Sequence, residues 1–142
     1  MEPRSVLFLC TGNSCRSQMA EAIVNHELGD TWLAQSAGTR PAGFVHPLAV
    51  AALAEIGIRH HGRSKAVEEF RQAEFDLVVT VCDSAAEDCP VWLGRGSRLH
   101  IGFPDPAGAA GSEAEALDAF RRVRDDIRRQ VVAALKTFSP SA

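Results

Sequence analysis

The chain of 142 residues has no tyrosine, few aromatic residues and no long hydrophobic run. No segment approaches the ~20 consecutive apolar residues that a transmembrane helix requires, so a membrane protein is not expected. The short apolar stretch after Arg4 does not resemble a signal peptide, which predicts a cytoplasmic protein. A formal net charge of -3 gives no electrostatic reason to expect a nucleic-acid partner.

Neither repeats nor long linkers interrupt the chain, and 46% hydrophobic content is enough for one sizeable core. We therefore expect a single domain over residues 1–142, and a monomer. Strand and helix signals alternate, which favours the α/β class with a four-stranded parallel sheet flanked by helices on both faces. Apolar periodicity and stop signals predict strands at 5–9, 32–36, 75–81 and 99–101, and helices at 16–28, 47–56, 67–72 and 113–137.

A loop of small residues joins the first strand to the first helix: Cys10, Thr11, Gly12, Asn13, Ser14, Cys15, Arg16 and Ser17. Its backbone N–H groups can converge on a tetrahedral oxyanion at the helix start, and Arg16 can clamp two oxygens. The same positive field favours the nucleophilic thiolate of Cys10, to which Ser17 could donate a hydrogen bond. The alternative is a buried strand-end cysteine before an ordinary turn; the register of strand, loop and arginine favours the oxyanion site.

Cys82 and Asp105 follow two other predicted strands, and ligands of open α/β sheets bind beyond the carboxyl ends of strands. Thiols stay reduced in the cytoplasm, so four cysteines favour catalysis, redox cycling or metal binding over structural disulfides. The spacings C-x4-C and C-x6-C are unlike those of zinc sites, so no metal is expected. Cys15, inside the loop, has no required role.

Cys82 and Cys89 are seven residues apart, which in a regular helix corresponds to ~10.5 Å along the axis. The Cα atoms of a disulfide lie no more than about 7 Å apart. The two thiols can therefore bond only if the segment bends or unwinds, and its Ser, Ala, Asp and Glu residues allow this cheaply. We hypothesise a redox switch here; the alternative is that both cysteines are unremarkable small residues near a strand end.

The segment CTGNSCRS resembles the phosphate loop of the low-molecular-weight protein tyrosine phosphatase superfamily. The cysteines of this loop and of the segment VVTVCDSAAEDCP resemble those of the thioredoxin-coupled arsenate reductases of that superfamily. This resemblance covers nearly the whole chain. The resemblance implies a phosphatase-like fold, Cys10 as the nucleophile on arsenate and Cys82 as the thiol that attacks arsenylated Cys10 and releases arsenite. Cys89 would then leave a Cys82 to Cys89 disulfide for thioredoxin, the expected electron donor, with mycothiol and glutaredoxin systems as the alternatives.

Asp105, between Pro104 and Pro106, corresponds to the general acid of the resembled family. A simple turn is the alternative, but the position after the fourth strand favours catalysis. Phosphatases of the family usually place tyrosines beside this loop, and none is present here, so arsenate suits the site better than phosphotyrosine. Residual phosphatase activity is expected. A redox or anion-sensing module without turnover would leave Asp105 without a role.

Several of the resembled reductases bind potassium through Asn13, a serine matching Ser36 and an acidic residue. Here Lys65 stands at the acidic position, and its ammonium could replace the cation, so activity without potassium and without any bound cofactor is expected. The pair His60 and His61 lies in a polar segment and is expected to face solvent.

His46, before Pro47, is expected near a helix start, and His26 and His100 are expected to be structural.

Overall fold

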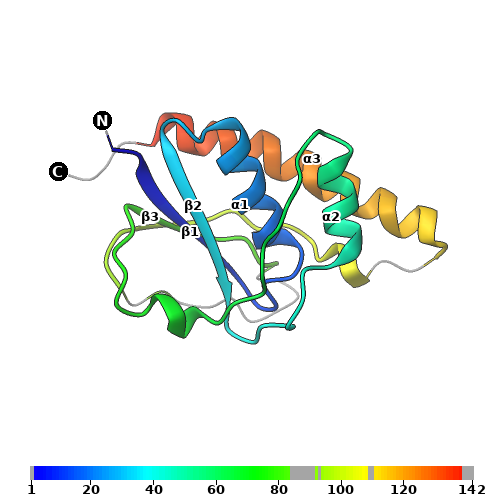
Figure 1. Ribbon diagram of the computed structural model, residues 1–142, viewed down its shortest axis with the longest axis horizontal. Helices are drawn as coiled ribbons and strands as arrows, with labels where there is room; N and C mark the ends of the chain where they lie inside the picture. The colour runs from blue at the N-terminus through cyan, green and yellow to red at the C-terminus, as the bar shows by residue number, and fades with distance from the viewer. Residues whose placement is uncertain (1, 84–91, 93, 109–110, 139–142) are drawn as a thin grey trace.

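A parallel sheet forms the centre of the computed structural model, which describes residues 2–83, 92, 94–108 and 111–138. Its four strands run in the order β2-β1-β3-β4, and every neighbouring pair is parallel (Figure 1). The strands are β1 (Arg4–Cys10), β2 (Trp32–Gly38), β3 (Leu77–Thr80) and β4 (Ser97–His100). The predicted α/β class and parallel sheet are confirmed.

The described residues also form three α-helices and two 3-10 helices. They are α1 (Arg16–Glu27), α2 (Pro47–Ala54), α3 (Glu113–Thr137), η1 (Val67–Phe70) and η2 (Pro106–Gly108). Of these, η2 and α3 follow the last strand. His46 accepts a hydrogen bond from the backbone N–H of Leu48 and so caps α2, which confirms its expected place at a helix start. No helix in the described part of the chain is long and apolar enough to cross a membrane.

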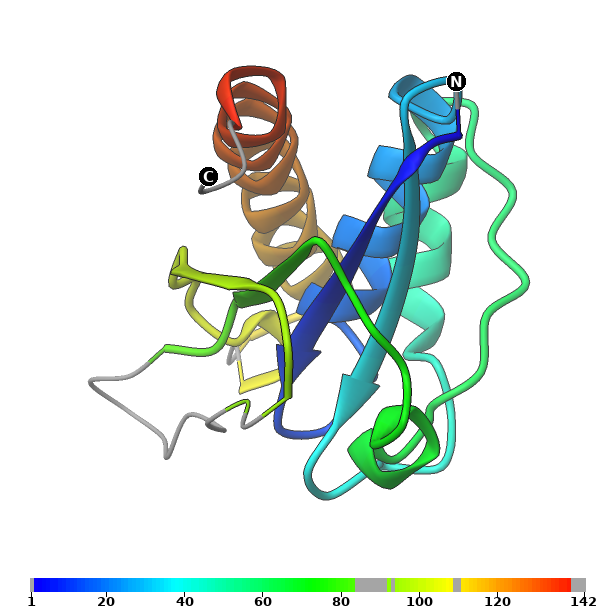
Figure 2. The same ribbon diagram turned by 90° about the vertical axis from the view of Figure 1, so that its left-hand side faces the viewer.

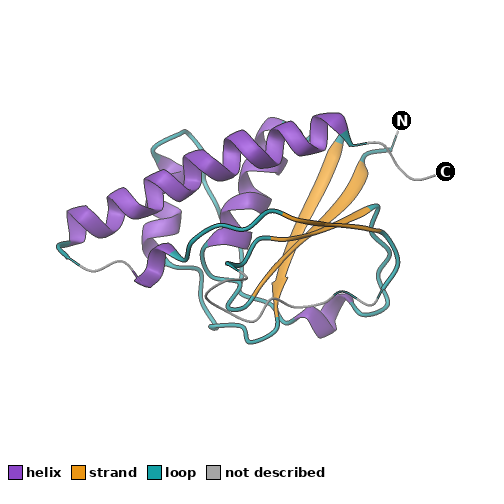
Figure 3. Ribbon diagram, turned by 180° about the vertical axis from the view of Figure 1, so that it is seen from behind, coloured by secondary structure: helices purple, strands orange, loops and turns teal. Residues whose placement is uncertain are grey.

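The two faces of β1 pack into separate cores, because successive side chains of a strand point to opposite faces. One core joins the β1 side chains Val6 and Phe8 to apolar residues of α1, α2 and α3. Leu7 and Leu9 pack on the other face, with Phe70 of η1. Figure 2 shows the three α-helices gathered on one side of the sheet, and Figure 3, from behind, shows α3 lying across the others. In the described part of the chain, the three α-helices therefore cover one face of the sheet, and the 3-10 turn η1 packs against the other.

The two shorter strands differ from their predicted bounds, and β3 covers only Leu77–Thr80 of the predicted 75–81. β4 begins and ends before the predicted 99–101, because its bounds are set by pairing with β3, from Leu77 opposite Ser97 to Thr80 opposite His100. Most of β4 is exposed at the sheet edge, so its apolar pattern is weak. The predicted helix at 67–72 is only the 3-10 turn η1.

The carboxyl ends of three strands meet at one edge of the sheet. Val81 donates its backbone N–H to Leu9 (2.9 Å), and Phe103 donates to Val81 (3.3 Å). Cys10, Cys82 and the segment leading to Asp105 are therefore brought to the same side of the molecule, as expected for ligand sites of open α/β sheets.

Candidate active site

The loop from Cys10 to Arg16 presents its backbone N–H groups as an anion site. Its carbonyl groups are engaged by the backbone of a neighbouring segment: Thr11 accepts from Arg40 (2.9 Å), Gly12 from Ala42 (2.9 Å) and Ser14 from His46 (3.0 Å). In a planar trans peptide the N–H points opposite to the C=O, so these bonds turn the N–H groups the other way. No side chain caps the start of α1, which leaves its first N–H groups for an anion.

Two backbone features fix the shape of this loop. Asn13 has φ 48, in the left-handed region that asparagine tolerates better than most residues. Gly38, at the end of β2, lies against the loop: a Cβ there would be 2.4 Å from the Thr11 oxygen and 3.0 Å from the Asn13 nitrogen. Since both neighbours are backbone atoms that cannot swing aside, only glycine lets β2 approach the loop this closely.

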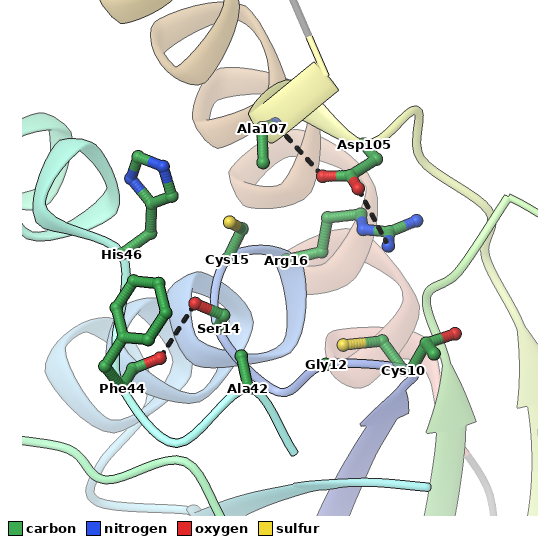
Figure 4. A pocket seen from close by; sticks show the side chains of 11 residues that line it. Cys10, Gly12, Ser14, Cys15, Arg16, Ala42, Phe44, His46, Asp105 and Ala107 are labelled. Carbon is green, nitrogen blue, oxygen red and sulfur yellow. Dashed lines mark hydrogen bonds and ion pairs between the residues drawn. The ribbon is translucent and has the colours of Figure 1, made fainter. Parts of the chain in front are cut away.

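A pocket of about 340 Å³ opens over the loop (Figure 4). Its wall includes loop residues, Asp105 and Ala107 on one side, and Phe44 and His46 on the other. The Ser14 hydroxyl donates to the Phe44 carbonyl (2.8 Å) and holds that side in place. Phe44 and His46 were not predicted to belong to the site, because no local sequence pattern shows that the connection from β2 to α2 folds back onto the loop.

Arg16 and Asp105 lie side by side at the pocket. Arg16 is only 4% exposed, and its guanidinium donates to the Phe103 carbonyl (3.2 Å). Its Nη2 is 4.0 Å from the Asp105 Oδ2, while the backbone of Ala107 donates to the other carboxylate oxygen (3.0 Å). The Asp105 side chain is half exposed. A carboxyl group and a buried guanidinium thus stand together at the pocket wall.

The Cys10 sulfur has a hydrogen-bond partner of its own. It lies 2.9 Å from the Ser17 hydroxyl oxygen, which accepts a hydrogen bond from the Asn13 Nδ2 (2.8 Å). Since the Ser17 oxygen accepts the hydrogen bond from Asn13, the Ser17 hydroxyl hydrogen can be donated to the Cys10 sulfur. A hydrogen bond of this kind stabilises a thiolate. The predicted proximity of Cys10 and Ser17 is thereby present in the structure.

Cys15 shares the pocket wall and is a different kind of thiol. Both Cys10 and Cys15 are free. Burial, reinforced by the charges of Asp105 and Cys10, raises the pKa of the Cys15 thiol to about 12. Cys15 is therefore protonated at neutral pH and is no competing nucleophile, since only a thiolate attacks.

Comparison with known proteins agrees with this geometry. A model of the low molecular weight phosphotyrosine protein phosphatase family matches residues 5–140. The chain belongs to this family. An arsenate reductase of Halalkalibacterium halodurans is 45% identical over 140 residues, covering 98% of this chain and 97% of that protein.

Solved structures of related proteins have the same fold as this phosphatase-family chain. A structure described as an arsenate reductase in the phosphate binding state has a TM-score of 0.80 and 29% identity, covering 96% of this chain and 99% of the other. A Corynebacterium glutamicum thioredoxin-dependent arsenate reductase has a TM-score of 0.65 and 25% identity, covering 96% of this chain and 64% of the other.

Cys82 lies two residues beyond the end of β3 in this phosphatase-family fold and is fully buried. It is disulfide-bonded, whereas Cys10 and Cys15 are free thiols. Cys82 shares a core with Cys10 but is not among the described residues of the pocket wall. Cys89 lies outside the described residues, so the predicted contact between the two relay thiols stays a prediction.

Lys65 occupies a buried polar site behind the loop. Its Nζ donates to the Arg63 carbonyl (3.0 Å) and lies 3.7 Å from the Glu21 Oε1, which also accepts from the Ser36 hydroxyl (3.0 Å). Burial raises the pKa of the Glu21 carboxyl, while the charge of Lys65 lowers it. An ammonium at this place does not fit a potassium ion, because it offers donors where a cation needs oxygen ligands.

The paired histidines differ from each other. His61 is exposed, as predicted, but His60 is half-buried and its Nε2 lies 2.7 Å from the Gln18 Oε1, so the prediction of a solvent-facing ring is wrong for His60. The reason is a contact between residues 42 positions apart, which local polarity does not reveal.

Proposed function

We propose that the protein reduces arsenate to arsenite. The observation that carries this proposal is the pocket in which Cys10, with a hydroxyl donor on its sulfur, faces Arg16 and Asp105 at the start of α1. A tetrahedral oxyanion matches the N–H groups and the guanidinium of this site. The arsenate reductases among the relatives support arsenate as the substrate.

In the first step, the Cys10 thiolate attacks arsenic, and Thr11, Gly12, Asn13, Ser14, Cys15 and Arg16 hold the oxyanion. One arsenic–oxygen bond breaks as the sulfur–arsenic bond forms. Asp105 gives its proton to the departing oxygen, which leaves as water. Its 4.0 Å separation from Arg16 puts the acid beside the group that binds the oxyanion.

In the second step, Cys82 attacks the Cys10 sulfur. The electron pair of the sulfur–arsenic bond stays on arsenic, which leaves as arsenite, and a Cys10 to Cys82 disulfide forms. Cys89 then attacks the Cys82 sulfur, which frees Cys10 and leaves a Cys82 to Cys89 disulfide for reduced thioredoxin, in the cytoplasm. The disulfide-bonded state of Cys82 and the thioredoxin-dependent neighbour support this relay.

The decisive experiment follows arsenate-dependent NADPH oxidation with thioredoxin and thioredoxin reductase. The unaltered protein is expected to turn over continuously. Cys89→Ser is expected to release a single equivalent of arsenite and then stop, because the first two thiols still react once. Turnover that continues in Cys89→Ser would overturn the relay, and no turnover of the unaltered protein would overturn arsenate reduction.

Slow hydrolysis of phosphate monoesters is the second candidate activity, since phosphate has the shape and charge of arsenate. The rate of this hydrolysis should depend on Cys10 and Asp105, and Cys89→Ser should leave it unchanged. Asp105→Asn separates both activities from a sensing module, because a module that only binds would not respond to loss of the acid.

Turnover should be independent of potassium, because the Lys65 ammonium holds the position beside Glu21. The measurement exchanges sodium for potassium at fixed ionic strength and fixed anion. A clear rise in rate with potassium would contradict this prediction.

The segment 82–90 is proposed to refold when its cysteines are oxidised. Hydrogen exchange over these residues should therefore differ between the reduced and oxidised protein, and equal exchange would rule out the switch.

A further inference from the structure

A chain of side-chain hydrogen bonds leads from Cys10 to a histidine outside the pocket. The Cys10 sulfur lies 2.9 Å from the Ser17 hydroxyl, to which the Asn13 Nδ2 donates (2.8 Å). The Gln18 Nε2 in turn donates to the Asn13 Oδ1 (3.0 Å). The last member is His60, whose Nε2 is 2.7 Å from the Gln18 Oε1.

With Cys10 as the thiolate, which can only accept, every bond of this chain donates toward Cys10. The two hydrogens of the Gln18 amide nitrogen serve three oxygens, because the Asn13 carbonyl (3.1 Å) and the Arg63 carbonyl (2.9 Å) are acceptors beside the Asn13 Oδ1. The Gln18 oxygen must therefore face His60. Since that oxygen can only accept, the His60 Nε2 carries the hydrogen. The Asn13 Oδ1 also accepts from the Lys65 backbone (2.8 Å), which turns the Asn13 amide nitrogen toward Ser17.

We propose that His60 is a positioning residue for the nucleophile: by donating to Gln18 it aligns the two amides so that the Ser17 hydroxyl donates to the Cys10 sulfur. Gln18, Asn13 and Ser17 are all 0% exposed. Hydrogen bonds in such a buried chain polarise one another, so a stronger first donor strengthens the last one. The inference rests on the proposed function only in taking Cys10 as the nucleophile.

The space around Gly62 is independent support for the hydrogen bond between His60 and Gln18. A Cβ on Gly62 would lie 2.3 Å from the His60 Nε2 and 2.4 Å from the Gln18 Oε1. A side chain at this position would therefore occupy the space of the hydrogen bond itself. Both neighbouring atoms are ends of side chains, so Gly62→Ala can displace the His60 ring without disturbing the backbone.

The hydrogen bond from His60 to Gln18 is expected to persist over a range of pH, because of the groups around His60. Burial, with the charges of Lys65 and His61, lowers the pKa of His60, which favours the neutral ring at neutral pH. Protonation would add a hydrogen at Nδ1 and leave the Nε2 donor in place. The contribution of His60 should therefore be visible on both sides of its titration.

The test measures how fast iodoacetamide alkylates Cys10 over a pH series, with the site read by peptide mass spectrometry of the prereduced protein. His60→Ala and Gly62→Ala should slow alkylation at neutral pH by about three-fold. The midpoint of the rate profile should move to higher pH in both variants. His61→Ala is the matched control, because its side chain is exposed beside His60, and it should behave as the unaltered protein.

Two further variants separate positioning from a loss of fold. His60→Gln keeps an N–H donor and should restore most of the rate. In Gln18→Met, which breaks the chain, adding His60→Ala should have no further effect. An unchanged profile in His60→Ala, or equal slowing in His61→Ala, would overturn the inference. Arsenate turnover is assayed separately, so a protein that alkylates as expected but reduces no arsenate overturns only the proposed function.

Discussion

At the residue scale, the reactivity of the site depends on side chains that never touch solvent. Ser17 and Asn13 are both 0% exposed, and each has a polar neighbour inside the protein. Buried polar groups carry a cost unless their bonds are made, so these positions tolerate little change. The loop from Cys10 to Arg16 and the residues behind it are therefore part of the packed protein interior as well as of the pocket wall.

Ser17→Ala should lower kcat/KM for arsenate about ten-fold, because Cys10 loses its hydroxyl donor and the Asn13 Nδ2 loses its acceptor. Steady-state kinetics and the melting temperature are measured together. Thr137→Ala, on an exposed part of α3, is the control and should leave kcat/KM unchanged. Full activity in Ser17→Ala would show that the hydroxyl does not assist the sulfur.

Residues directly beyond strand ends could be predicted from the sequence, and those that reach the site over long distances could not. Cys10 ends β1 and Asp105 lies in the segment after β4, so the geometry of parallel sheets places both at the same edge. Gln18 and His60 meet across 42 positions, and Phe44 reaches the pocket through a backbone contact 30 positions away. Neither contact leaves a periodic or compositional trace.

At the element scale, boundaries with a strong local sequence signal could be predicted, and boundaries with a weak signal could not. The predicted helix at 113–137 has the bounds of α3, which begins with a capping box in which Ser112 and Glu115 satisfy each other's backbone N–H groups. β4 has no such signal, because an exposed edge strand is defined by its partner β3 and not by its own apolar pattern.

Ser112→Ala should lower the free energy of unfolding by ~1 kcal/mol, because the first turn of α3 loses its side-chain acceptor. Urea denaturation measures the change. Ser112→Asp, whose carboxylate also caps a helix, should stay close to the unaltered protein. Equal losses in both variants would mean that the cap does not stabilise α3.

At the scale of the whole molecule, charged side chains link α2 to α3. Arg121 and Arg124 of α3 both bind Glu55, the residue after α2, at 2.6 and 2.8 Å. Hydrogen bonds from Arg121, and then from Arg124, lower the pKa of Glu55 from 4.5 to about 2. This connection joins two helices that cover the same side of the sheet.

The connection gives stability a defined pH dependence. Since folding lowers the pKa of Glu55, its contribution is present above pH 4.5 and is lost as the pH falls toward about 2. The melting temperature of Glu55→Gln should therefore be ~2 °C lower than that of the unaltered protein at neutral pH. This difference in melting temperature should disappear as the pH falls from 4.5 toward about 2. Glu68→Gln, in an exposed pair with Arg71, should have no such effect. A difference that persists to the lowest pH would contradict the assignment.

The order in which the chain is synthesised sets when its thiol becomes useful. Cys10 leaves the ribosome early, but its loop is held by Arg40, Ala42 and Ser64, and β1 gains its second neighbour only with β3. A nascent chain that stops before residue 40 therefore carries Cys10 without any of these loop contacts. Such a fragment has the reactivity of an ordinary thiol, and its selectivity for oxyanions arises only when these distant segments dock.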